Sequence, residues 1–404
     1  MIPINASFGG LSRRGYNPGA SIPTPTITSV TSGQTWIGRV NNSTYNPYNS
    51  GNSSLVIAGT DLSTINSVTL WNGTSSGGSL GTITAQTNTS ITLTYGISSS
   101  LAAGNYYIRV TSSLGPVATS ATTLIKVSSI NITSASNYEY AGATGYRSYY
   151  AMSATSGATT GTVDVVNGPY PGQVTVVLAG GGAGGGSGFR SSTTTFYRGG
   201  GGGAGLLGFV NLNGTLATGS SSFTLGAGGA GGVGGGSSSN GASSTFQNGT
   251  GTLYTAAGGG RGGGSTAPSS GGSGGGGRAS TTTGGSPWAS QAGAAGVSPA
   301  GSNLATVYVG NGFANSNGTS GGGAGAGTSG GATGAFNGLA VISASPTLDL
   351  PTYWCNGGTG TSSFSSTVNG TTPGSGGRGG GASSSGGSNG GNGYSGGIFL
   401  HIQI

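Results

Sequence analysis

The chain has 404 residues, and only 4% of them are charged, whereas about a quarter of the residues of an ordinary globular protein are charged. Its acids, its histidine and its cysteine are Asp61, Glu139, Asp164, Asp349, His401 and Cys355. Because general acids, bases, nucleophiles and metal ligands come mostly from these residue types, we expect no enzymatic activity, no cofactor and no metal site. The formal charge of +7 is spread along the chain, which does not favour nucleic-acid binding.

Residues 1–24 are predicted to form an irregular arm, because they contain three prolines and show little hydrophobic periodicity. The arm does not begin with a basic region followed by an apolar core, so no signal peptide is predicted and we expect synthesis in a cytoplasm. No apolar run is long enough to cross a bilayer, so membrane insertion is not expected. The adjacent Arg13 and Arg14 either attach the arm to an acidic partner or form a solvated tail.

Residues 25–127 are predicted to form a β-sandwich, because seven short β-branched or aromatic segments alternate with turn-forming clusters. These segments are Thr26–Val30, Leu55–Ala58, Ser67–Trp71, Thr82–Ala85, Ser90–Tyr95, Tyr106–Thr111 and Thr122–Val127. Pro25–Val30, Leu55–Leu62 and Ala103–Val110 resemble strands of the IPT/TIG immunoglobulin-like family. The resemblance implies a spacer or a binding module and does not choose between them.

Residues 128–170 are predicted to be a tyrosine-rich connector between two domains. Their tyrosines are Tyr138, Tyr140, Tyr146, Tyr149 and Tyr150. Such a cluster can present a contact surface for sugar or protein, because aromatic rings offer a large amphipathic area at low entropy cost. Covering a sheet or an interdomain seam is the commoner use of such residues, and both interpretations stay open.

Residues 171–404 are predicted to form a glycine-rich domain of short strands and bundled polyglycine II helices. Residues 1–170 contain 20 of the 94 glycines, which leaves 94 − 20 = 74 for this second part. Apolar islands recur between the glycine runs, and within one run Ala227, Ala230 and Val233 are three residues apart. Period three is the period of the polyproline II helix, whose backbone groups must pair with neighbouring helices where water is excluded. Collagen is rejected because the chain has only 14 prolines. The whole chain is thus expected to be all-β, with essentially no α-helix.

Gln173–Gly188, Gly199–Val210 and Phe223–Gly232 resemble, in this order, the glycine-rich domains of bacteriophage tail-fibre and adhesin proteins. They are also similar to a glycine-rich domain of some animal receptor kinases, but those carry many cysteines that this chain lacks. The phage resemblance implies a virion protein that is made in the host cytoplasm and assembles with other virion proteins. It further implies contact with a host surface polysaccharide or outer-membrane protein, and a homo-oligomer, with a trimer as one form.

In that family, loops between the polyglycine helices contact the bacterial surface, so non-glycine inserts with aromatic residues become the receptor-contact candidates. The inserts are Arg190–Arg198, Ser286–Ser290 and Tyr353–Asn356, and the candidates in them are Phe196, Tyr197, Trp288, Tyr353 and Trp354. Trp288 and Trp354 have a second interpretation, in which they cap the ends of the bundle as small hydrophobic cores. The alternatives to a tail fibre or tip adhesin are a capsid or neck decoration protein, a cellular surface or matrix protein and, last, a carbohydrate-processing enzyme.

Overall fold

The computed structural model describes residues 22–31, 36–40, 53–95, 101–121, 123–134, 137–140, 146–152, 159–170, 172–282, 294–297, 300–312, 320–326, 339–342, 348–360, 367–383 and 386–403. In this part of the chain there are strands, one 3-10 turn at Leu62–Thr64 and no α-helix, which confirms the all-β prediction. The chain divides into two compact units. The first takes Met1–Thr35, Tyr48–Ser98 and Asn105–Ile125, and the second takes Trp36–Pro47, Ser99–Gly104 and Lys126–Ile404.

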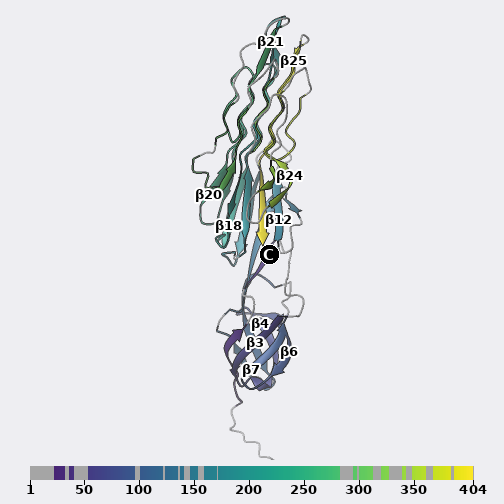
Figure 1. The fold of residues 1–404 in the computed structure, drawn as a ribbon. Coiled ribbons are helices and arrows are strands. Elements are labelled where there is room, and N and C mark those ends of the chain that lie inside the picture. Colours follow the sequence, from purple (N-terminus) through teal and green to yellow (C-terminus); the bar gives the residue numbers. More distant parts are fainter. Residues whose placement is uncertain are drawn as a thin grey trace, which may run out of the picture. The chain divides into compact units, whose positions relative to one another are not determined.

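The first unit contains two antiparallel sheets, in the region where a β-sandwich was predicted (Figure 1). One sheet has the order β1 (Thr26–Thr31), β3 (Ser53–Thr60), β7 (Ser90–Tyr95) and β6 (Gly81–Gln86). In the other, β4 (Ile65–Trp71) pairs with β5 (Ser76–Ser79) and β8 (Gly104–Ser112), and β9 (Val117–Thr119) also pairs with β8. Alternate residues such as Leu55, Ile57, Leu93 and Ile108 are completely buried, because successive side chains of a strand point to opposite faces.

Two sheets form what we call the frame of the second unit. One is built from β2 (Trp36–Val40), β10 (Ile125–Ser134), β13 (Thr159–Val166), β18 (Gly219–Leu225), β19 (Ser244–Gln247) and β20 (Leu253–Ala256). The other has the order β11 (Asn137–Tyr140), β12 (Tyr146–Met152), β27 (Gly397–Gln403), β14 (Val174–Ala179), β17 (Leu207–Asn211) and β22 (Thr306–Tyr308). Buried residues of both sheets, among them Ile130, Val176, Phe223 and Leu400, form one core cluster.

The prediction of a connector over residues 128–170 is wrong, because these residues form strands β10 to β13 of the frame. Tyr149 and Tyr150 lie opposite Leu400 and Phe399 in the β12–β27 register. Strand β27 lies between β12 and β14, so its backbone groups pair on both sides. The tyrosine-rich segment therefore supplies the hydrogen-bonding partner that this interior strand requires.

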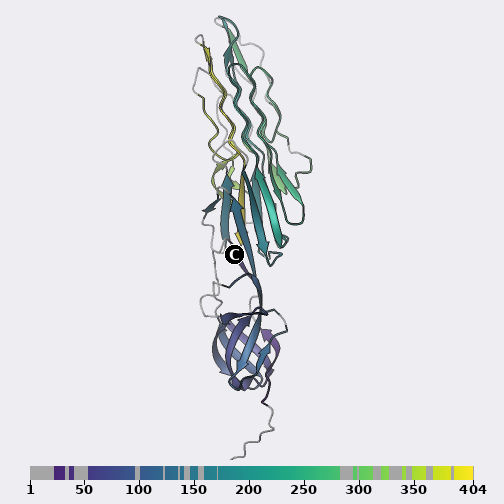
Figure 2. The same cartoon turned by 180° about the vertical axis from the view of Figure 1, so that it is seen from behind.

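The glycine runs form the predicted bundle of polyglycine II helices, which extends from the frame strands (Figures 1 and 2). The first helix, residues 180–188, continues directly from β14. Its N–H groups donate in rotation to three neighbouring segments, with N–O distances of 2.8–3.0 Å. The donor–acceptor pairs are Gly180–Leu206, Ala183–Gly203 and Gly186–Gly200; Gly181–Ala242 and Gly184–Ser239; Gly182–Tyr394, Gly185–Gly391 and Gly188–Ser388.

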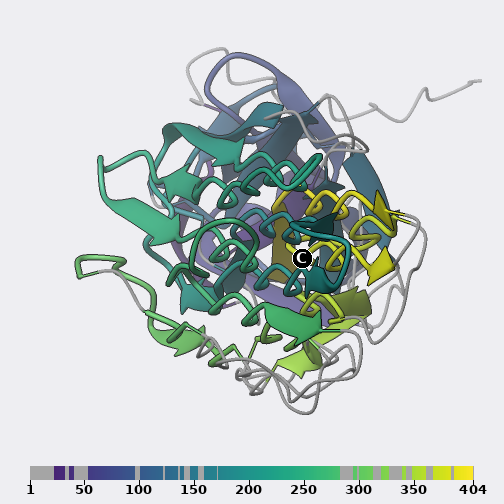
Figure 3. The same ribbon diagram turned by 90° about the horizontal axis from the view of Figure 1, so that it is seen from above.

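Carbonyl groups of the same helix accept hydrogen bonds from three further segments. The donor–acceptor pairs are Gly229–Gly182 and Gly232–Gly185; Gly259–Gly181 and Gly262–Gly184; Gly377–Ala183 and Gly380–Gly186. Helix 180–188 is therefore surrounded by six neighbours, which is the hexagonal arrangement that a three-residue period permits. Helix 199–206 lies beside it and is bonded in the same way to six segments. Figure 3 views these chains from above.

Close approach of the backbones explains the glycine content of the bundle. A Cβ at Gly185 would overlap the carbonyl oxygen of Arg378, and one at Gly186 would overlap that of Gly263. Residues on the outer side of the bundle escape this restriction, and Val233 is 66% exposed. Glycine is thus required wherever a Cβ would meet a neighbouring backbone, and the other inward positions hold small residues such as Ala183 and Ser187, which are completely buried.

Four short pairings complete the second unit. At the end of the bundle away from the frame, β15 (Phe189–Arg190), β16 (Thr195–Arg198) and β21 (Ala279–Thr282) form a three-stranded sheet (Figure 1). Near them, β25 (Ala382–Ser383) pairs with β26 (Gly386–Gly387). Closer to the frame, β23 (Leu339–Ile342) pairs with β24 (Leu348–Trp354).

Candidate functional site

The end of the bundle farthest from the frame is built around the turn that joins helix 180–188 to helix 199–206. Strands β15 and β16 form a hairpin there, and β21 extends it to a small sheet. The hairpin loop, Ser191–Thr194, is exposed throughout. We call Phe189, Arg190, Phe196, Tyr197, Arg198 and Arg278 the tip cluster. This sheet places the non-glycine side chains of Arg190–Arg198 where the bundle ends.

One face of the small sheet carries a stack of rings. Phe189 lies opposite Tyr197 in the register, and their rings are stacked with centroids 4.6 Å apart and planes 16° apart. The guanidinium carbon of Arg278 lies 5.1 Å from the centroid of the Tyr197 ring. Arg278 also donates a hydrogen bond from Nη1 to the carbonyl of Gly264 over 2.9 Å. A ring face and a backbone carbonyl together fix the position of this cation.

The opposite face of the sheet repeats this arrangement with different residues. Phe196 is buried, with 8% of its surface exposed, and lies opposite Arg190 in the register. The guanidinium carbon of Arg190 lies 5.9 Å from the Phe196 centroid, and its Nε donates to the carbonyl of Ser192 over 2.9 Å. Arg198 follows on the same face, where burial lowers the pKa of its guanidinium below the usual range. Both faces thus combine an aromatic ring with an oriented guanidinium.

The tip cluster concentrates positive charge. It contains three of the five arginines between residues 172 and 404 and no acid. The four acids of the chain lie elsewhere: Asp61 in the first unit, Glu139 in β11, Asp164 in β13 and Asp349 in β24. A surface with one sign of charge attracts partners of the opposite sign over several ångströms.

The structure places the predicted contact residues in different environments. Tyr197 is half-buried in the tip cluster. Phe196 is buried beneath Arg190, so the interpretation of its ring as an exposed contact is wrong. For Trp354, the interpretation as an exposed contact is wrong, because its side chain is completely buried. Tyr353 lies in strand β24, where only its backbone is described. Trp288, Arg13 and Arg14 lie outside the described residues.

Trp354 belongs to a junction cluster between the frame and the bundle. This cluster comprises Val177, Ala179, Ala204, Leu207, Phe209, Ala326, Trp354, Cys355 and Phe399. Its members come from frame strands and from polyglycine helices, so it seals the base of the bundle with apolar side chains. This arrangement agrees with the alternative interpretation of Trp354, in which its side chain belongs to a small hydrophobic core at one end of the bundle.

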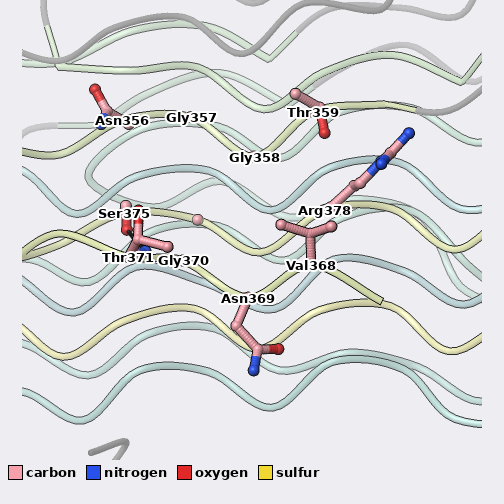
Figure 4. Close-up of a pocket in the computed structure, with 11 residues that line it drawn as sticks. Asn356, Gly357, Gly358, Thr359, Val368, Asn369, Gly370, Thr371, Ser375 and Arg378 are labelled. Carbon is pink, nitrogen blue, oxygen red and sulfur yellow. Dashed lines mark hydrogen bonds between the residues drawn. The ribbon is translucent and has the colours of Figure 1, made fainter. Parts of the chain in front are cut away.

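A hollow of about 180 Å³ opens on the side of the bundle (Figure 4). Its lining is Asn356, Gly357, Gly358, Thr359, Val368, Asn369, Gly370, Thr371, Ser375, Gly376 and Arg378. Arg378 is the one ionisable residue of this lining, and its Nε is buried without a hydrogen bond among the described residues. The remaining lining consists of glycines, Val368 and uncharged polar residues, so it holds no acid or histidine that could serve as a general acid or base beside Arg378.

The sequence patterns above do not single out Phe189 and Arg278 of the tip cluster. Phe189 immediately follows the run Gly184–Gly188, which contains one serine, and Arg278 immediately follows the run Gly274–Gly277. Strand-forming residues come after each of them. The first side chain after a glycine run marks the end of a polyglycine helix, and this signal identifies both positions. The sequence gives no indication that Tyr197 and Arg278, about 80 positions apart, meet at one end of the bundle.

Across the described part of the chain, histidine, cysteine and carboxylate side chains nowhere gather in threes as a metal ion would require. The same residues include no helix with the length and apolar character needed to cross a lipid bilayer. Comparisons with protein-family models, with curated proteins and with solved structures found no match to this chain.

Proposed function

We propose that this protein is a structural protein of a bacteriophage virion, a tail fibre or tip adhesin whose tip cluster contacts the bacterial host surface. The observation that carries the proposal is the bundle itself. Two helices with six hydrogen-bonded neighbours each, 180–188 and 199–206, run between the frame and the tip and are joined by the tip hairpin. The order of glycine runs and strands resembles that of phage adhesins, and this bundle is the structure such an order is expected to form.

Rigidity of the bundle supports a role in presenting a contact surface. Helix 180–188 pairs its backbone groups with all six neighbours, so its glycines have no freedom to act as a flexible linker. Turns at the far end carry the side chains, and residues on loops of a rigid scaffold are where binding functions concentrate. A scaffold of this kind holds a contact surface in place without needing a large apolar core around it.

The near absence of charged residues also fits a structural virion protein better than an enzyme. We expect no catalytic activity, assembly with other virion proteins, and a homo-oligomeric fibre or tip. We also propose that the N-terminal arm, with Arg13 and Arg14, attaches the protein to the particle. This assignment rests on the sequence and on the resemblance to phage proteins.

Gold-labelled antibody against residues 172–404, applied to native particles, tests the proposal. Label confined to the tail ends is the expected result, and purified protein should then block infection by competing for the host surface. Label spread over the capsid would contradict the adhesin role and favour a decoration protein. Unlabelled particles from the phage that encodes this chain would contradict the virion assignment.

A further inference from the structure

We infer that the tip cluster binds an acidic polysaccharide, with its arginines on the carboxylates and the exposed hydroxyls of the hairpin loop on the sugar. This inference rests on the proposed function, since it names the class of host ligand for the same surface.

The positive charge of the tip cluster favours an anionic ligand. Arg190 and Arg198 lie in one small sheet, and Arg278 directly precedes its strand β21. Every acid of the chain lies in the first unit or in strands β11, β13 and β24. The sequence also has no acid anywhere between Asp164 and Asp349, so no loop near the tip can lower this charge. A concentrated positive end on a chain with few other charges selects a partner of negative charge.

Two guanidinium groups of the tip cluster are held in place before any ligand binds. Arg278 is fixed by the Tyr197 ring and the Gly264 carbonyl, and Arg190 by the Phe196 ring and the Ser192 carbonyl. A guanidinium stays positively charged, and its planar fork matches the geometry of a carboxylate. Because the two side chains are already ordered, little rotamer entropy remains to be lost when an anion binds.

The polarity of the surface distinguishes a polysaccharide from a protein partner. The hairpin loop consists of Ser191, Ser192, Thr193 and Thr194, all exposed. Hydroxyl groups donate and accept hydrogen bonds, as the hydroxyls of a sugar also do. Phe196 is buried and Tyr197 is half-buried, so the tip exposes little of the aromatic area that forms the centre of a protein interface. Hydroxyls beside fixed cations fit a hydroxyl-rich anion.

Calorimetric titration of the full-length protein with polygalacturonate tests the inference, with methyl-esterified polygalacturonate as the matched neutral polymer. We expect binding of the acid form and at least about tenfold weaker binding of the ester, because the ester cannot form charge-assisted hydrogen bonds. Equal affinity for acid and ester would overturn the inference. So would equal affinity for polyglutamate, which offers carboxylates without sugar and would point to an acidic protein partner.

The variants Arg190→Gln and Arg278→Gln, combined, should weaken binding of polygalacturonate by about tenfold or more. Arg261→Gln is the matched control, because Arg261 also lies against a backbone carbonyl, that of Ala267, but outside the tip. An equal loss in the control would mean that total charge, and not the tip, determines binding. The comparison of acid with ester uses only unaltered protein, so it decides the question even if the double variant folds poorly.

Labelling of host cells by the same protein separates the two proposals. If the protein binds host cells but does not bind polygalacturonate, the adhesin function is supported and the acidic-polysaccharide ligand is contradicted. Protein that binds neither contradicts both.

Discussion

Trp354 meets Phe399 edge-on, with ring centroids 6.4 Å apart and planes at 89°. Phe399 lies on β27, the interior strand of a frame sheet, and Trp354 ends β24 just before the chain enters the polyglycine segment 356–360. The contact therefore ties a bundle chain to an interior strand of the frame. Edge-to-face ring pairs of this kind stabilise a core beyond the burial of their area.

Replacing Trp354 by alanine should destabilise the second unit by about 3–5 kcal/mol, the usual cost of removing a large buried aromatic side chain. Denaturant unfolding followed by circular dichroism measures this free energy. Val233→Ala is the control, because Val233 is 66% exposed and surface substitutions change stability by less than about 0.5 kcal/mol. Similar effects of the two substitutions would show that the junction cluster does not hold the bundle to the frame.

Adding one methyl group inside the bundle should be more damaging than most core substitutions. In Gly185→Ala the new Cβ would overlap the carbonyl oxygen of Arg378, and a backbone cannot yield as a flexible side chain does. We expect a loss above the roughly 1–3 kcal/mol that is typical of overpacking, seen as a lower melting temperature in calorimetry.

Gly249→Ala is the matched control for this prediction. A Cβ at Gly249 would have its nearest neighbours at 3.8 Å, which is ordinary van der Waals contact. Its melting temperature should stay close to that of the unaltered protein. Equal shifts in the two variants would mean that glycine acts through chain entropy and not through the close approach of helices.

Local periodicity predicted much of this fold, because both strands and polyglycine helices have short repeats. The period of three placed Ala227, Ala230 and Val233 on one side of their helix; in the structure Ala230 and Val233 are exposed and Ala227 is half-buried. Contacts between distant segments could not be predicted in the same way. Glycine runs are nearly interchangeable in sequence, so nothing in Gly180–Gly188 identifies which six segments surround it.

The candidate site was predictable to a similar extent. The insert Arg190–Arg198 was recognised because side chains interrupt glycine there, and it does form the tip hairpin. Which of its rings is buried depends on strand alternation, and the pairing of Tyr197 with Arg278 depends on helix packing. The sequence was equally compatible with Trp354 as a receptor contact and as part of a core that caps the bundle. The burial of its side chain depends on strands that lie far away along the chain.

His401 should make the stability of the second unit depend on pH. It is 9% exposed, with Thr175 and Ser148 opposite it on the neighbouring strands, and burial lowers its pKa below the usual 6.5. The unfolded chain therefore takes up a proton at higher pH than the folded chain does. Stability contributed by the neutral ring is complete above pH 6.5 and is lost as the pH falls from there through the folded pKa.

The slope in that range should be at most about 1.4 kcal/mol per pH unit, the limit for one group. Unfolding free energies of the unaltered protein and of His401→Gln, measured from pH 8 downward, provide the comparison. Their difference should change below pH 6.5 and level off at lower pH. Parallel curves across the range would contradict the assignment to His401.

Cys355 should react with thiol reagents only when the bundle opens. Its side chain is completely buried in the junction cluster, and burial raises the pKa of the thiol well above its usual range, so the reactive thiolate is suppressed. Labelling with 5,5′-dithiobis(2-nitrobenzoate) should be fast in denaturant and slower by orders of magnitude in buffer, with Cys355→Ser giving the background. Because Cys355 is the only cysteine, the rate in buffer reports how often the junction between frame and bundle opens. Equal rates in buffer and in denaturant would show that this junction is not closed in solution.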